Sequence, residues 1–205
     1  MKPSHFFFVT LLLSIFIYSI SFTQQYAIGG GLSYAIENSN VKGAAGFEAH
    51  FTFLTESALA VRASVGRFGS EVKVDKLTEG DYSLLWIEGT LLAQAKGGSV
   101  QPYGGLGIGY YITGHEISSK VNNAFYSIGL RVKEDIEDIA GIHLRGGINI
   151  PVSATVDFNA DVKYVFLKPK DNAEATNLQT FQSATNSLEV DLSTLFINVG
   201  FSIRL

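Results

Sequence analysis

The chain has 205 residues, a length suited to one domain. Its formal net charge of −4 argues against a nucleic-acid partner, which normally leaves a basic patch, and the absence of cysteine excludes disulfides and a lipoprotein acylation site. Its 21 glycines stand beside only 4 prolines, so the composition is not that of a disordered linker.

The first residues have the pattern of a secretory signal peptide. Lys2 supplies a positive charge, residues 6–20 are apolar, and small residues suited to cleavage follow at Ser21 and Thr23. The alternative is a transmembrane helix, but an apolar stretch of about 15 residues is shorter than the roughly 20 that a span requires. We therefore expect the leader to be removed.

Eight later segments alternate apolar residues with polar or small ones, as β-strands with one apolar face do. In the first segment Ile28, Leu32 and Tyr34 share one face, while glycines and a serine occupy the other. The expected strands are residues 25–37, 44–53, 58–68, 81–95, 100–112, 139–150, 156–167 and 192–205.

The connections between these strands alternate in length, apart from a short one at 38–43. The short turns are residues 54–57, 96–99 and 151–155, and the long connections are residues 69–80, 113–138 and 168–190. Transmembrane β-barrels have short periplasmic turns and long extracellular loops. Both ends of the mature chain should then lie at the periplasmic side.

The predicted fold class is all-β, an eight-stranded antiparallel up-and-down transmembrane barrel. An even number of strands closes such a barrel and leaves no unpaired edge in the bilayer. The alternative is a soluble sandwich or a lipocalin-like barrel. Its outer face would be charged, whereas the polar face here carries many glycines and few charges, which suits a lumen.

Six charged residues face the lumen by parity and fall near mid-height of the barrel; we call them the charge plug. They are Glu48, Arg62, Glu88, Arg145, Asp161 and Lys163. An eight-stranded barrel has an interior just wide enough for side chains, and buried charges must pair. We expect a salt-bridged plug that closes the barrel, with a gated polar conduction path as the alternative.

Six apolar residues face inward above the charge plug; we call them the mouth set. They are Phe68, Leu84, Trp86, Tyr111, Val165 and Phe196. An apolar lining over a polar floor suits a small hydrophobic ligand. The alternative is that these side chains simply fill the mouth. A β-bulge in strand 81–95 would turn Trp86 toward lipid and weaken the pocket hypothesis.

The histidines give no strong sign of catalysis. His50 and His143 face inward by parity, and His115 falls in an expected loop. A lipid-modifying barrel would need a serine and a histidine that reach acyl chains. We expect no enzyme activity, no catalytic residues, and neither a metal nor another cofactor.

Two further motifs have simple structural interpretations. The glycines of residues 104–109 look like a dinucleotide loop, but a strand continues after them where that loop requires a helix. We expect them instead to make room for large side chains of neighbouring strands. The acidic run Glu134, Asp135, Glu137 and Asp138 is interpreted as the solvated base of a loop rather than a divalent-cation site near lipopolysaccharide.

Residues 101–111, QPYGGLGIGYY, resemble the fifth strand of the outer-membrane protein W (OmpW) family. Residues 146–151, GGINIP, followed by residues 156–164, VDFNADVKY, resemble the sixth-to-seventh hairpin of that family. The resemblance covers roughly residues 100–167. The rest matches a generic small barrel and also fits the broader OmpA/OmpX-like group.

The resemblance implies a monomeric barrel in the outer membrane of a Gram-negative bacterium, in contact with lipid and lipopolysaccharide. The barrel-assembly machinery would insert it. It also implies binding or passage of small hydrophobic molecules. One alternative is a surface-interaction protein acting through loops 113–138 and 168–190, and a less favoured one is a lipid-modifying enzyme. The expected division is a signal peptide at 1–23 and a barrel domain at 24–205.

Overall fold

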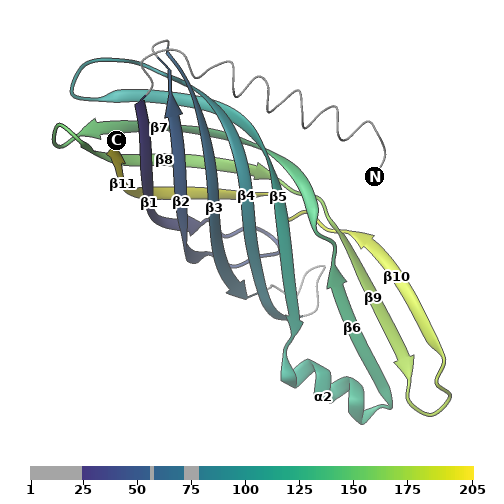
Figure 1. Ribbon diagram of the computed structural model, residues 1–205. Helices are drawn as coiled ribbons and strands as arrows, with labels where there is room; N and C mark the ends of the chain where they lie inside the picture. Colours follow the sequence, from purple (N-terminus) through teal and green to yellow (C-terminus); the bar gives the residue numbers. More distant parts are fainter. Residues whose placement is uncertain (1–24, 56–57, 72–78) are drawn as a thin grey trace, which may run out of the picture.

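The computed structural model describes residues 25–55, 58–71 and 79–205, and its centre is a closed antiparallel barrel of eight strands (Figure 1). Around the barrel the order is β1-β11-β8-β7-β5-β4-β3-β2. The strands are β1 (Gln25–Ala35), β2 (Ala44–Leu54), β3 (Leu59–Glu71), β4 (Gly80–Gln94), β5 (Gln101–Ile117), β7 (Ile139–Pro151), β8 (Val156–Phe166) and β11 (Thr194–Arg204). The predicted fold class is confirmed. The expected signal peptide lies outside the described residues.

The strand register turns one apolar face of the barrel outward. Leu32 is 69% exposed and Ile108 is 71% exposed, values that only a hydrocarbon environment can accommodate for a whole belt of such residues. Strand β4 pairs without interruption with β3 and with β5, so no bulge intervenes and Trp86 points inward, fully buried. The outer wall is therefore the lipid-facing surface.

Inward glycines make room for the largest side chains of the lumen. A Cβ atom at Gly66 would run into the indole of Trp86, and one at Gly107 would run into the imidazole of His143. Glycine is required at these positions because neighbouring strands place a ring against the backbone.

The residues beyond one end of the barrel form a second sheet, and the expectation of loops there was wrong. Helix α2 (Ser119–Ser127) and strand β6 (Leu130–Ile136) follow β5, which runs five residues further than predicted. Strands β9 (Lys170–Asn177) and β10 (Ser183–Glu189) complete a three-stranded sheet in the order β10-β9-β6. β10 is exposed throughout, so its residues show no apolar alternation that would have marked it as a strand.

The chain ends lie at the other end of the barrel. The backbone N–H of Leu205 donates to the carbonyl of Tyr26 at 2.8 Å, and Figure 1 shows the C-terminus opposite the β6–β9–β10 sheet. The short turns that join β2 to β3, β4 to β5 and β7 to β8 share the end with Leu205, which makes that end periplasmic and the additional sheet extracellular. Within the described part of the chain, no helix has the length and apolar character needed to cross a membrane.

Candidate functional site

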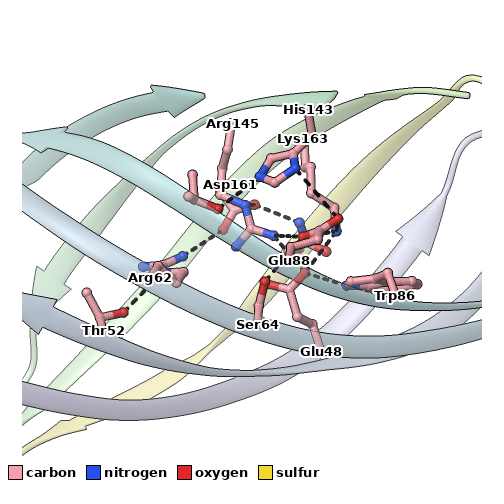
Figure 2. Close-up of polar contacts among 12 residues, drawn as sticks. Glu48, Thr52, Arg62, Ser64, Trp86, Glu88, His143, Arg145, Asp161 and Lys163 are labelled. Atoms are coloured by element: carbon pink, nitrogen blue, oxygen red, sulfur yellow. Dashed lines mark hydrogen bonds and ion pairs between the residues drawn. The ribbon is translucent and has the colours of Figure 1, made fainter. Parts of the chain in front are cut away.

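The six residues of the charge plug meet inside the barrel at mid-height (Figure 2). They come from five strands, β2, β3, β4, β7 and β8, and each is at most 7% exposed. Three carboxylates face three cations, so the formal charges of the six cancel. Alternation along the strands places each side chain inward, and only closure of the barrel brings the five strands around one point.

Lys163 is the centre of the charge plug. Its ammonium lies 3.0 Å from a carboxylate oxygen of Glu48 and 3.0 Å from both carboxylate oxygens of Glu88. Arg145 donates to Glu48 at 2.6 Å and lies 3.8 Å from Glu88. Each glutamate therefore contacts two cations, which offsets the cost of holding both carboxylates away from water.

Asp161 connects this centre to the periplasmic side. It accepts hydrogen bonds from the hydroxyl of Tyr103 at 2.8 Å and from the amide of Asn198 at 2.6 Å, and it lies 3.8 Å from Arg62. The Arg62 guanidinium in turn donates to Thr52 at 3.1 Å. Beyond Arg62 a polar vestibule of about 540 Å³ opens at the periplasmic end.

The mouth set packs into one apolar cluster above the charge plug. Its six side chains are at most 2% exposed. Phe196 anchors the cluster, with its ring centroid 5.4 Å from that of Phe68 and 5.3 Å from that of Trp86. In this arrangement the rings fill the barrel mouth, and a ligand in the expected pocket requires some of them to move apart.

Residues outside the barrel strands extend the apolar cluster toward the cell exterior. They are Val41, Ile136, Leu167, Val190 and Leu192, each at most 4% exposed. Sequence reasoning missed Val41, Ile136 and Val190 because they lie in segments expected to be loops. Leu167 and Leu192 lie at the ends of the expected strands 156–167 and 192–205 and were not singled out. No periodicity marks Val41, Ile136 or Val190, whereas the inward parity of Val165 and Phe196 would have assigned Leu167 and Leu192 to the lumen.

The apolar cluster rests directly on the charge plug. The ammonium of Lys163 lies 4.2 Å from the ring centre of Trp86 and 5.1 Å from that of Phe196. The indole N–H of Trp86 donates to Glu48 at 3.3 Å. The floor of the mouth is thus a charged group covered by aromatic faces, an arrangement that stabilises a cation through the ring quadrupole.

His143 belongs to the same network. Its Nε2 lies 2.9 Å from the hydroxyl of Thr90 and its Nδ1 lies 3.4 Å from the hydroxyl of Tyr111, which donates to Glu88 at 2.9 Å. Hydroxyl, imidazole and carboxylate follow one another as in a nucleophile–base pair with its orienting acid. Thr90 is only 1% exposed, however, so these groups hold the lumen together rather than face a substrate.

Two assignments at the extracellular end need correction. His115 lies on β5 rather than in a loop, and its Nε2 is 2.9 Å from a carboxylate oxygen of Glu134 on β6. Glu134 and Asp135 are strand residues, not a loop base. Across residues 25–55, 58–71 and 79–205, no three histidine, cysteine or acidic side chains are arranged to hold a metal ion.

Inward parity would also have found polar partners that the sequence analysis left out. Thr52, Ser64, Thr90 and Tyr103 alternate with outward apolar residues on their strands and hydrogen-bond to members of the network. Hydroxyl residues are uncharged, so they attract less notice than ionised ones. Ser64 and Tyr103 donate to the carboxylates of Glu88 and Asp161, whereas Thr52 accepts from Arg62 and Thr90 contacts His143.

Comparison with known proteins places this geometry among outer-membrane barrels. The profile of the OmpW family matches residues 33–205. No curated protein sequence matches the chain at a significant level.

Solved structures that share the fold include three outer-membrane proteins. OprG from Pseudomonas aeruginosa superposes with a TM-score of 0.71 at 18% identity, covering 89% of this chain and 96% of OprG. A major outer membrane protein from Thermus thermophilus gives 0.57 at 12% identity, covering 90% and 100%. Ail of Yersinia pestis, in complex with the heparin analogue sucrose octasulfate, gives 0.52 at 14% identity, covering 90% and 100%.

Proposed function

The chain belongs to the OmpW family, and on that premise we propose that its barrel binds small hydrophobic molecules in its extracellular half and passes them through that half. The protein lies in the outer membrane of a Gram-negative bacterium. Family members are porin-like and generally not enzymes, so we propose no reaction.

The observation that carries the proposal is the unbroken apolar column from the extracellular segments to the charge plug. Leu192 and Ile136 lie at its outer end, Phe68 and Phe196 in its middle, and Trp86 at its floor. When a small hydrophobic molecule enters this column, contacts among the apolar side chains are replaced by contacts with the molecule. It meets no polar barrier until it reaches Lys163.

The charge plug separates binding from axial conduction. A hydrophobic molecule has no favourable contact with the Glu48, Glu88 and Lys163 cluster, so we propose that it stops above these groups. Ions can cross only if the ion pairs part. A wild-type barrel in a planar bilayer should therefore be nearly silent, whereas Glu88→Ala should show discrete openings.

The single-channel experiment adds an alkyl-chain amphiphile from the extracellular side. If the column binds it, the Glu88→Ala openings should be blocked in a saturable manner. Openings that are insensitive to the amphiphile would contradict the ligand site. Wild-type openings as large as those of Glu88→Ala would contradict the closed plug, so the two failures are distinguishable.

Trp86 gives a direct readout of binding because it is the chain's one tryptophan and lies at the floor of the column. A brominated alkyl ligand should quench its emission at low concentration. A brominated phospholipid, confined to the outer wall, serves as the matched control. Equal quenching by the brominated ligand and the brominated phospholipid would count against the pocket. In a separate assay with a radiolabelled apolar ligand, Trp86→Asp should lose binding while the barrel remains folded.

A second candidate function is surface interaction through the β6–β9–β10 sheet. Phe181, at the tip of the β9–β10 hairpin, is 82% exposed and has a φ of 56°, an unfavourable conformation for a bulky residue. Residues 118–138 and 168–191 carry 8 carboxylates and 5 cations, so a sulfated sugar such as the heparin analogue seen with Ail is disfavoured. A protein partner with an apolar pocket suits the tip better. Cell adhesion should fall in Phe181→Gly if this candidate holds.

A further inference from the structure

A polar groove lies on the outer wall at the extracellular rim, where β3, β4 and β5 meet. Its volume is about 780 Å³. Small residues in register, Gly69, Ser83 and Gly114, form its floor. Its charged lining consists of Lys42, Arg67, Glu71, Asp81 and Glu116. Lys42 and Glu71 form an exposed ion pair across it.

A second, apolar groove of about 760 Å³ lies lower on the same wall. Ile87, Ile108, Tyr110, Ile142 and Phe166 line it, and all five are between 42% and 71% exposed on the lipid-facing surface. Its floor contains Gly89, where an added Cβ atom would meet no atom within 4 Å. Gly89 therefore leaves a depression between the outward side chains of the neighbouring strands.

The two grooves are aligned along β4 and β5. Ser83 pairs with Gly114 in the polar groove, and Gly89 lies beside Ile108 in the apolar one. Only the outward pair Leu85 and Ile112 lies between the linings. Six residues along a strand span about 20 Å, which is comparable to one leaflet of hydrocarbon, about 15 Å, plus part of its headgroup region.

We propose that the two grooves together form a binding site for the lipid A portion of lipopolysaccharide. An acyl chain occupies the apolar groove, and the phosphorylated sugar occupies the polar groove above it. Arg67 and Lys42 contact phosphate directly, while Asp81 and Glu116, neighbours in the register, reach phosphate through a divalent cation. The inference rests on the outer-membrane location and is independent of the proposed ligand column inside the barrel.

The charge distribution selects this lipid over a phospholipid of the inner leaflet. The polar groove lies at the extracellular rim, where the outer leaflet has its headgroups. A groove with both cations and carboxylates suits a multiply phosphorylated headgroup that brings divalent cations with it. Van der Waals packing must hold the acyl chain in the groove. The hydrophobic effect does not favour the groove over the bilayer, because the surrounding lipid is equally apolar.

Two variants test the site, and each alters one groove. Gly89→Phe fills the apolar groove without disturbing the backbone, and Arg67→Glu reverses a charge in the polar groove. Gly104→Phe is the matched control: Gly104 also faces outward on β5, but in the periplasmic half, with no atom closer than 3.9 Å to an added Cβ. Heat-modifiable migration on gels verifies that each variant folds.

The measurement is native mass spectrometry of the delipidated barrel, titrated with lipid A in detergent containing Mg²⁺. We expect one lipid A per wild-type barrel, with Kd about tenfold weaker for Gly89→Phe and for Arg67→Glu, and unchanged for Gly104→Phe. Phosphatidylethanolamine should bind the wild type about tenfold more weakly than lipid A. Wild-type affinity in Gly89→Phe or Arg67→Glu, or equal binding of phosphatidylethanolamine, would overturn the proposal.

Discussion

The ammonium of Lys163 lies 3.0 Å from both carboxylate oxygens of Glu88, in the middle of the barrel and out of contact with water. Buried charges of this kind are costly unless each one is paired and hydrogen-bonded. Tyr111 and Ser64 supply Glu88 with further hydrogen bonds, at 2.9 Å and 3.2 Å. The pair is therefore central to the packing of the lumen. Substitutions at Lys163 or Glu88 should change both the stability and the permeability of the barrel.

Lys163→Met should destabilise the barrel by about 3–5 kcal/mol, because Glu48 and Glu88 then lose a shared cation in a buried position. Urea unfolding in lipid vesicles, followed by gel mobility, measures the change. Lys168→Met removes an exposed lysine just beyond the same strand and should leave the midpoint unchanged. A Lys163→Met midpoint equal to that of Lys168→Met would show that the pairing contributes little.

The double variant Lys163→Met with Glu88→Gln should recover part of that loss. Removing both charges leaves fewer uncompensated groups than removing the cation alone, so the two substitutions should not be additive. A double-mutant cycle on the same unfolding assay gives the coupling free energy. Strict additivity would mean that Glu48 and Arg145, rather than Glu88, determine the environment of Lys163.

Gly107→Val should destabilise the barrel by roughly 1–3 kcal/mol or prevent assembly, because its Cβ would overlap the imidazole of His143 and the backbone of β4. Gly146→Val places the same side chain on the lipid-facing surface, where an added Cβ has no neighbour closer than 3.9 Å, and should fold normally. Yield of heat-modifiable barrel after refolding compares the two. Equal yields would contradict the inward direction of Gly107.

Asp171→Asn should stabilise the extracellular sheet at neutral pH. Burial raises the pKa of Asp171 above its ordinary value of 3.8, and the nearby Glu134 and Asp135 raise this pKa further. The folded state then holds the proton more tightly than the unfolded state, so the stability of the sheet falls as pH rises from about 3.8 through the raised pKa and stays lower above it.

Amide exchange of β9, corrected for the intrinsic pH dependence, reports this effect. Protection in Asp171→Asn should exceed that of the wild type at neutral pH and converge with it in acid. Glu189→Gln, an exposed change of the same charge on β10, should behave as the wild type does. Lower protection in Asp171→Asn at neutral pH would show that the carboxylate is needed in its ionised form.

Phe181→Gly should stabilise the β9–β10 hairpin by about 0.5–1 kcal/mol, since glycine adopts a positive φ without steric cost. Proteolysis at the hairpin tip provides the measurement. Gln182→Gly, at the adjacent position, is the matched control and should not stabilise the hairpin. A less stable Phe181→Gly would mean that the ring makes a contact that its 82% exposure does not suggest.

The sequence by itself determined the barrel. Period-two alternation assigns Glu48, Lys163 and Trp86 to the inward face, and the alternating connection lengths orient the strands, because both signals are local along the chain. The resemblance of residues 100–167 to the OmpW family is likewise local, and the family assignment confirms it.

Only the tertiary structure decided which inward groups touch. Lys163 on β8 meets Glu48 on β2, which is 115 residues away in the chain, because barrel closure and strand stagger bring them to one height. The extracellular sheet could not be predicted from the sequence. β9 and β10 are polar on both faces, and the pairing of β9 with β10 and with β6 holds the sheet together, rather than a buried apolar face that would leave a periodic pattern.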